Sequence, residues 1–264
     1  MVQPPGFVNL AHPTHVCKLH KSLYALKQAL HAWFNRSSTF LLSLGFSRKF
    51  YVAFEHQFDI KDLGPLTYFL GLQLVSHNGA FYLNQLKYVH DLLHKSNLQH
   101  AKPSSTPFAA KSVLTASAGD LLTSLTEYRE LVGSPQYLTF TRPNISFAVN
   151  TVAQFISSPR SPHMVAVKRI LRYVKGTIDF GLHFTPQDPS TRLIIYSYTN
   201  WAGCPNFRRS TTGYLIYLGS NLMSWCSRKQ PTVSRSSVES EYCALAYACA
   251  KSSWLCSLLH ELGV

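Results

Sequence analysis

The amino-acid sequence predicts an α+β protein, with a small hairpin region, a helical middle and a three-strand sheet packed by one long helix. Three observations lead to this fold class. The pair Asn78–Gly79 between two β-rich runs marks a hairpin. Residues 127–192 contain three sets of helix start and stop signals. Residues 193–229 contain three short β-rich runs, and a segment of helical periodicity follows them.

The first hundred residues predict two helices in addition to the hairpin. Apolar residues recur near helical spacing over roughly Ser22–Leu44, and Gly45 ends that run. The second helix follows the hairpin and carries His90 and His94, which lie four residues apart in the run HDLLH. This spacing suits paired metal ligands, but no third ligand is evident, so a solvated helix face is the favoured interpretation.

The middle of the chain predicts a linker and then three helices. Residues 101–126 are rich in Ser, Thr, Ala and Pro without clear periodicity, which is typical of a linker. The first helix has Thr126 as its candidate cap, and we expect Gly133 and Pro135 to break it. The second helix is expected to begin at Pro143, because proline suits the first turn of a helix.

The third helix of this segment is predicted to run from Ser161–Pro162 to a stop at Gly176. Its buried side is expected to comprise Val167, Ile170, Leu171 and Val174. A basic stripe beside it comprises Lys168, Arg172 and Lys175. Cations at this spacing can follow a phosphate backbone, although an ordinary solvated helix face explains the stripe equally well.

The C-terminal segment predicts three strands and one helix. The strands are the runs LIIYSY, GYLIYLG and LMSWC, and Gly219–Ser220–Asn221 is the loop between the last two. A basic loop, Ser227–Arg235, leads to a helix that starts at Ser236, which forms a capping box with Glu239. One apolar stripe of this helix comprises Val238, Tyr242, Leu245, Ala246 and Cys249.

Composition makes the chain strongly basic, with 25 Lys and Arg against 12 Asp and Glu and a formal net charge of +13. Such a balance favours polyanionic partners, and nucleic acid is the first candidate. The alternative is a piece of a polyprotein whose acidic neighbours were lost. An apolar content of 46% excludes a chain that is disordered by composition.

The six cysteines include no Cys-x-x-Cys pair. They predict buried free thiols in a reducing compartment. The sequence contains no signal peptide and no apolar run near 18 residues. We therefore expect an intracellular protein, in the cytoplasm or the nucleus, without a membrane association.

Four ordered segments resemble the ribonuclease H domain of copia-type retrotransposon Pol polyproteins, namely Tyr196–Gly203, Arg208–Tyr214, Ser224–Val233 and Ser236–Ala246. The run QPPGF with the helix after it resembles the reverse-transcriptase palm of that family, and the Asn78–Gly79 hairpin with its helix resembles the primer grip and thumb. The resemblance implies a partial reverse transcriptase over 1–100, a linker over 101–126, a helical connection over 127–192 and the first half of a ribonuclease H-like domain over 193–264.

The resemblance places acidic residues of the ribonuclease H site where this chain has Tyr198, Asn200 and Glu241. Hydrolysis with two Mg²⁺ ions needs several converging carboxylates. Glu239 cannot replace the missing ones, because two helical residues subtend about 200° and it therefore points away from Glu241. We expect an incomplete metal site, no bound cofactor and a vestigial Glu241.

The polymerase centre is expected to be missing as well. In the family, two catalytic aspartates form a Tyr-x-Asp-Asp turn after the first helix, whereas only the run SRKFYVAFEHQ separates Phe46 from Phe58 in this chain. No two acidic residues are adjacent anywhere in the sequence. The resemblance therefore implies a truncated and internally deleted polyprotein.

The resemblance places further basic residues where the family binds an RNA–DNA hybrid. For these residues we favour phosphate contact over the alternative of a solubilising loop. They are Arg208, Arg209, Arg228, Lys229 and Arg235. Together with the basic stripe they predict non-specific nucleic-acid binding by an inactive remnant, a pseudoenzyme. Two alternatives are a metal-dependent hybrid nuclease completed by a partner chain, and an interaction module that associates with intact Pol.

Overall fold

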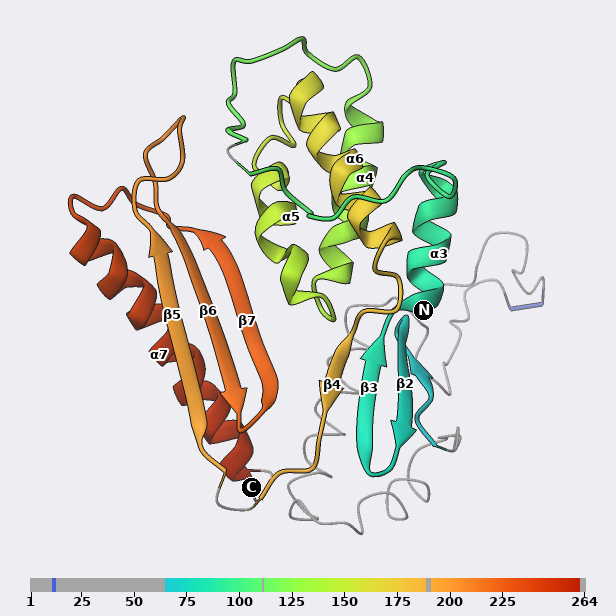
Figure 1. The fold of residues 1–264 in the computed structure, drawn as a ribbon, viewed down its shortest axis with the longest axis vertical. Coiled ribbons are helices and arrows are strands. Elements are labelled where there is room, and N and C mark those ends of the chain that lie inside the picture. Colours follow the sequence, from blue (N-terminus) through green and yellow to red (C-terminus); the bar gives the residue numbers. More distant parts are fainter. Residues whose placement is uncertain (1–10, 13–64, 111, 189–190, 262–264) are drawn as a thin grey trace. The chain divides into compact units, whose positions relative to one another are not determined.

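A computed structural model describes residues 11–12, 65–110, 112–188 and 191–261. The chain divides into two compact units, Met1–Leu63 and Gly64–Val264, and every element below belongs to the second. The predicted helix over Ser22–Leu44 and the junction after Phe46 lie outside the described residues. The described part mixes helices with two small antiparallel sheets, which confirms the predicted α+β class (Figure 1).

The helices of the described part are α3 (Leu86–Lys95), α4 (Leu125–Leu138), the 3₁₀ turn η1 (Pro143–Ile145), α5 (Ser146–Ala153), α6 (Ser161–Lys175) and α7 (Ser237–Glu261). Its strands are β1 (Tyr68–Phe69), β2 (Leu72–His77), β3 (Ala80–Asn84), β4 (Leu182–Phe184), β5 (Leu193–Asn200), β6 (Thr211–Leu218) and β7 (Asn221–Lys229). None of these helices is both long enough and apolar enough to cross a membrane.

Strands β1 to β4 form one antiparallel sheet in that order. The predicted hairpin is confirmed: Asn78 and Gly79 connect β2 to β3, and both have positive φ, 49° and 77°, as a type I′ turn requires. Strand β4 returns from far along the chain to pair with β3, so that Leu182 lies opposite Leu83. The sequence does not predict β1 or β4, because such short strands show no periodicity.

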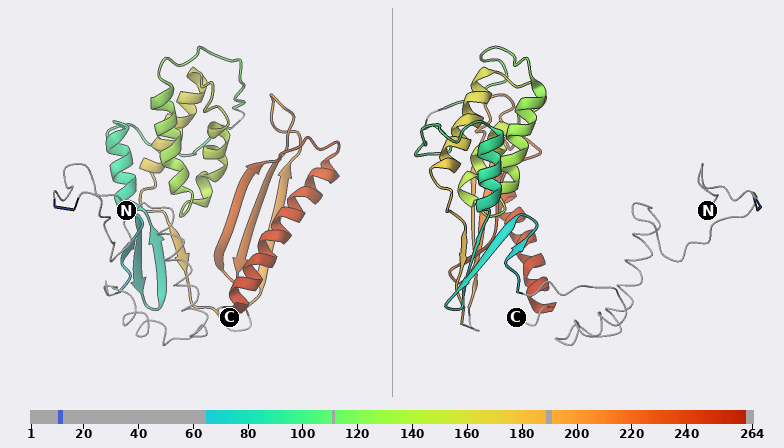
Figure 2. Two further views of the ribbon diagram at one scale, coloured as in Figure 1. Left: turned by 180° about the vertical axis from the view of Figure 1, so that it is seen from behind. Right: turned by 90° about the vertical axis from the view of Figure 1, so that its right-hand side faces the viewer.

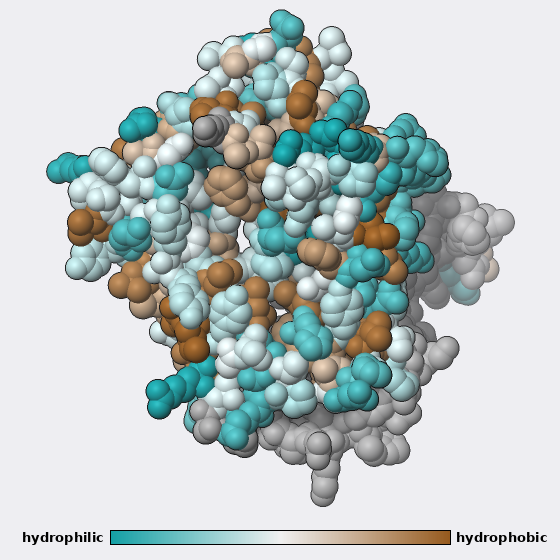
Figure 3. Space-filling model, viewed as in Figure 1, coloured by the Kyte–Doolittle hydropathy of each residue, from teal (hydrophilic) through white to brown (hydrophobic). Residues whose placement is uncertain are grey.

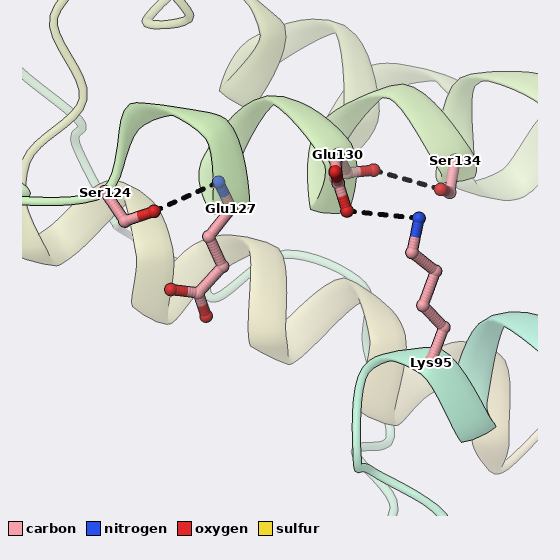
Figure 4. A network of polar contacts seen from close by, with 5 residues as sticks. All are labelled: Lys95, Ser124, Glu127, Glu130 and Ser134. Carbon is pink, nitrogen blue, oxygen red and sulfur yellow. Dashed lines mark hydrogen bonds and ion pairs between the residues drawn. The ribbon is translucent and has the colours of Figure 1, made fainter.

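The helices α3 to α6 enclose a hydrophobic core. The predicted buried side of α6 is confirmed, since Val167, Ile170, Leu171 and Val174 are all fully buried. Tyr128 of α4 is also fully buried, and its hydroxyl donates to the carbonyl of Val152 at 2.8 Å. On the surface, Lys95 of α3 pairs with Glu130 of α4 at 3.1 Å, as Figure 4 shows.

Helix α4 corrects two predictions. It runs without a break through Gly133 and Pro135, because packing of Pro135 into the core outweighs the hydrogen bond that proline cannot make. Its cap is Ser124 rather than Thr126, and the Ser124 Oγ accepts from the backbone N–H of Glu127 at 3.3 Å (Figure 4). The helix therefore begins earlier than the sequence suggests and extends beyond its predicted break.

The three predicted C-terminal strands are confirmed and form a second antiparallel sheet in the order β5-β6-β7. Strand β7 extends to Lys229, so the basic loop begins later than predicted. Helix α7 crosses one face of this sheet and packs on β5 and β6 (Figure 2). On β7, the Trp225 indole N–H donates to the carbonyl of Thr139 at 3.0 Å, which connects the sheet to the segment after α4.

Helix α7 packs on the sheet with a face of small residues rather than with the apolar stripe. Its buried residues are Ser240, Ala244, Ala248 and Leu255. In the stripe, Tyr242 is 69% exposed and Cys249 is also exposed, so the prediction that Cys249 is buried is wrong. The physical reason is that small side chains let a helix approach a sheet closely, whereas bulky apolar ones hold it away.

Candidate functional site

The positions at which the resemblance implies acidic residues lie at the free edge of the second sheet. Strand β5 is an edge strand, and side chains alternate between its two faces. Thr199 pairs with Thr212, which lies under α7, so Tyr198 and Asn200 point to the face that α7 does not cover. Tyr198 is 66% exposed on that face.

Glu241 is exposed on α7, where its Oε1 accepts from the backbone N–H of Thr199 at 3.4 Å. Glu239 is occupied elsewhere: its Oε2 accepts from the N–H of Arg235 at 2.7 Å, while its own N–H donates to Ser236 Oγ at 3.1 Å. The predicted capping box of Ser236 and Glu239 is thus present, but the Glu239 carboxylate accepts from the N–H of Arg235 rather than from that of Ser236. These residues do not fit a pair of Mg²⁺ ions, because Tyr198 and Asn200 are neutral and no cluster of three acidic, His or Cys side chains forms there among the described residues.

The two predicted non-ligand histidines are both exposed on α3. They are His90 and His94, and neither belongs to a cluster of three or more potential metal ligands among the described residues. Throughout the described ranges, no three His, Cys, Asp or Glu side chains gather closely enough to hold a metal ion.

Three of the predicted basic residues meet at one cavity. Arg209, Arg228 and Lys229 line a hollow of about 520 Å³ between the second sheet and the C-terminal half of α7. Lys251 and Trp254 of α7 line it too, and sequence reasoning missed both because it assigned the wrong face of α7 to the sheet. Two predicted residues, Arg208 and Arg235, are exposed but do not line the cavity.

The walls of this cavity are held by neutral groups. Gln230 is buried and donates from Nε2 to Thr212 Oγ1 and to the carbonyl of Ser240, both at 3.0 Å, so it connects β6 to α7.

Two further residues of the cavity wall, Tyr214 and Cys226, can ionise. Burial raises the pKa of the Tyr214 hydroxyl and that of the Cys226 thiol, and nearby Arg228 partly offsets this rise for Cys226. Both groups stay protonated at neutral pH, so Cys226 is not a reactive thiolate.

Two of the cavity's cations rest on aromatic rings. The Lys251 ammonium lies 3.6 Å from the centroid of the Trp254 ring, and the Lys229 ammonium lies 5.1 Å from that of Phe207. Such contacts hold a cation near an apolar surface without neutralising its charge. The cavity is therefore an electropositive, partly aromatic site.

The basic stripe on α6 is separate from this cavity, and its three side chains differ in exposure. Lys168 is exposed, whereas Arg172 and Lys175 are half-buried. Lys175 donates from Nζ to the carbonyl of Ala101 at 2.6 Å, and Ser104 donates from its N–H to the carbonyl of Arg172 at 3.2 Å. The segment that was predicted as a linker thus lies along α6, and Lys168 is the most exposed residue of the stripe. The buried Nε of Arg172 has no hydrogen-bond partner among the described residues.

Comparison with known proteins places this chain among retrotransposon polyproteins. A family model for reverse transcriptase (RNA-dependent DNA polymerase) matches residues 1–53. The chain is 40% identical to the retrovirus-related Pol polyprotein from transposon RE1 of Arabidopsis thaliana, over 100% of this chain and 20% of that protein. It is 33% identical to the Pol polyprotein from transposon TNT 1-94 of Nicotiana tabacum, over 100% of this chain and 23% of that protein. The chain belongs to the copia-type retrotransposon Pol family.

The chain spans about a fifth of the length of these copia-type polyproteins. An uncharacterized mitochondrial protein of Arabidopsis thaliana is 45% identical, over 75% of this chain and 81% of its own length. The alignment with the RE1 polyprotein extends over 301 residues against 264 here, so that relative carries residues that this chain lacks. The reverse-transcriptase match ends at residue 53, inside the short run between Phe46 and Phe58. No solved structure matches this chain.

Proposed function

We propose that this part of a copia-type Pol polyprotein is catalytically inactive and binds nucleic acid non-specifically through phosphate contacts. The observation that carries the proposal is the cavity lined by Arg209, Arg228, Lys229 and Lys251, because its lining contains no acidic side chain. None of these four cations forms an ion pair with a carboxylate of the described residues. Their charge is therefore available to an external polyanion.

The inactivity is supported by the residues at the edge of the second sheet. Tyr198 and Asn200 are neutral, and Glu241 faces the backbone N–H of Thr199. Two-metal hydrolysis needs several carboxylates around the ions, and a lone exposed glutamate holds neither ion firmly.

Binding is tested by fluorescence anisotropy with a labelled RNA–DNA hybrid at increasing salt. The logarithm of the association constant should fall linearly with the logarithm of salt concentration, by roughly 0.7–0.9 for each phosphate contacted. Replacing Arg209, Arg228 and Lys229 by Gln should make that slope shallower. The matched control replaces Lys102, Arg129 and Arg192, exposed cations away from the cavity, and should change it less. Affinity that does not respond to salt would refute the phosphate contacts.

Cleavage is tested with the same hybrid in Mg²⁺ or Mn²⁺, alone and mixed with an intact Pol ribonuclease H domain whose own catalytic acid has been replaced. We expect no product in either case. Product that appears only in the mixture, and is lost in Glu241→Ala, would instead establish the alternative of a nuclease completed by a partner chain.

A second candidate function, an interaction module for intact Pol, is supported by the uncovered face of the second sheet. Ile194, Tyr196, Tyr198 and Leu215 are exposed there, and Figure 3 views this face, where hydrophobic side chains lie among polar ones. Association should appear in co-purification with an intact Pol domain and weaken in Ile194→Lys/Tyr196→Lys. The pair Val238→Lys/Tyr242→Lys on the outer face of α7 is the control. A chain that never co-purifies would remove this candidate.

A further inference from the structure

The cavity beside α7 combines cationic and aromatic side chains. Its sheet side carries Arg228 and Lys229, which are cationic, whereas its helix side carries Tyr247 and Trp254, which offer aromatic rings. Trp254 is 54% exposed, so its indole is open to a ligand although Lys251 rests against it. A ligand that satisfies both sides must carry a negative charge and a flat ring.

We propose that this cavity binds one nucleoside phosphate unit, with the phosphate at Arg228 and Lys229 and the base stacked on Trp254. The proposal rests on the proposed nucleic-acid binding and specifies which element of the polymer this site takes. The planar guanidinium of Arg matches two phosphate oxygens at once, and Lys adds a point charge. Indole stacks on any base, because every base has a π-face. Inorganic phosphate alone would leave the aromatic side unused.

The size and the neutral walls of the cavity agree with a single unit. Its volume of about 520 Å³ lies within the roughly 300–1,000 Å³ that small-molecule sites occupy. Cys226 and Tyr214 stay protonated, as argued above, so neither adds a charge that would repel a phosphate. The bonds of Gln230 to Thr212 and Ser240 hold the two sides of the cavity together before any ligand arrives.

The test uses the full chain and follows tryptophan fluorescence during titration with adenosine 5′-monophosphate, adenosine and inorganic phosphate. Adenosine 5′-monophosphate should quench the emission and bind at least about fivefold more tightly than adenosine or phosphate. The quenching should disappear in Trp254→Phe, which assigns it to this residue among the four tryptophans. A short single strand with a 5′-phosphate, compared with its unphosphorylated form, shows whether the site takes a free nucleotide or a strand end.

The variant Arg228→Gln should weaken this binding by about tenfold, and Lys251→Gln is a second variant should the first fail to fold by circular dichroism. The matched control Arg192→Gln removes an exposed cation away from the cavity and should have no effect beyond a small general one. Equal loss in Arg228→Gln and Arg192→Gln, or no response to either the nucleotide or the phosphorylated strand, would overturn the proposal.

Hybrid binding measured on the same preparations separates the two proposals. If the hybrid binds with the expected salt dependence and the nucleotide does not, the cavity proposal fails while the proposed function stands. If the nucleotide binds through Trp254 and the hybrid does not, the cavity is a nucleotide site and the proposed polymer binding is wrong.

Discussion

The carboxylate of Glu241 on α7 accepts a hydrogen bond from the backbone N–H of Thr199 on the free edge of β5, with 3.4 Å between Oε1 and N. This contact gives Glu241 a modest structural role instead of a metal-binding one. Because the Glu241 carboxylate is exposed and the bond is long, Glu241→Gln should change the free energy of unfolding by less than about 1 kcal/mol. Urea denaturation of both proteins measures this. A loss of several kcal/mol would mean that the edge depends on Glu241 far more than its exposure indicates.

The packing of α7 on the sheet predicts that substitutions at two of its positions differ in their effect on stability. Ala248 is fully buried against the sheet, so Ala248→Leu should overpack the contact and cost about 1–3 kcal/mol. Tyr242 is 69% exposed, so Tyr242→Gln should stay within about 0.5 kcal/mol of the parent. Thermal and urea unfolding distinguish the two. The reverse order would show that the apolar stripe is the packed face.

Thiol accessibility gives an independent check of the same orientation. Cys249 and Cys256 are exposed on α7, whereas Cys204 is buried. Under native conditions, iodoacetamide should modify the first two well before Cys204, and peptide mass spectrometry locates the label. In denaturant all three should react at similar rates, which controls for intrinsic differences between the thiols.

The buried imidazole of His163 should make the stability of the folded chain depend on pH. Its ring is buried, accepts the N–H of Arg160 at Nδ1 over 2.9 Å, faces the Thr115 carbonyl through Nε2 at 3.1 Å, and stacks on Phe155. Burial lowers its pKa below the ordinary 6.5, and the charge of Arg160 acts in the same direction. As the pH falls through 6.5, the imidazole is protonated in the unfolded chain but stays neutral in the folded one. The free energy of unfolding should therefore decrease from that pH down to the lower pKa of the folded state.

Urea unfolding between about pH 7.5 and 5.5 measures this decline. The variant His163→Asn should be less stable at neutral pH, because it loses the ring stack, but its stability should fall less steeply over the same interval. A parent profile as flat as that of the variant would contradict the prediction.

The hydrogen bonds of buried Arg142 indicate that a lysine ammonium cannot replace its guanidinium without a loss of stability. It is 1% exposed, and it donates from Nη1 to the carbonyl of Thr177 at 2.8 Å, from Nη2 to Thr177 Oγ1 at 2.5 Å and from Nε towards Asn144 Oδ1 at 3.4 Å. One ammonium cannot reproduce this fork, so Arg142→Lys should cost about 1–3 kcal/mol. Arg129→Lys, on the exposed face of α4, is the matched control and should be nearly neutral.

Local signals in the sequence determined much of this fold. The turn chemistry of Asn78–Gly79 requires positive φ, which specifies a hairpin without reference to the rest of the chain. The apolar period of α6 identifies its buried side because bulky side chains alternate with charged ones there. Tyr198 and Asn200, at positions where the resemblance implies acidic residues, are equally read from the sequence, and they motivate the proposal of inactivity.

Tertiary structure decided what depends on distant partners. The pairing of β4 with β3 joins segments about a hundred residues apart, and no local pattern encodes such a pairing. The face of α7 could not be inferred from hydrophobicity, because close approach to the sheet selects Ala244 and Ala248 over larger apolar residues. That orientation in turn brings Lys251 and Trp254 to Arg228, so the cavity exists only once the helix has packed.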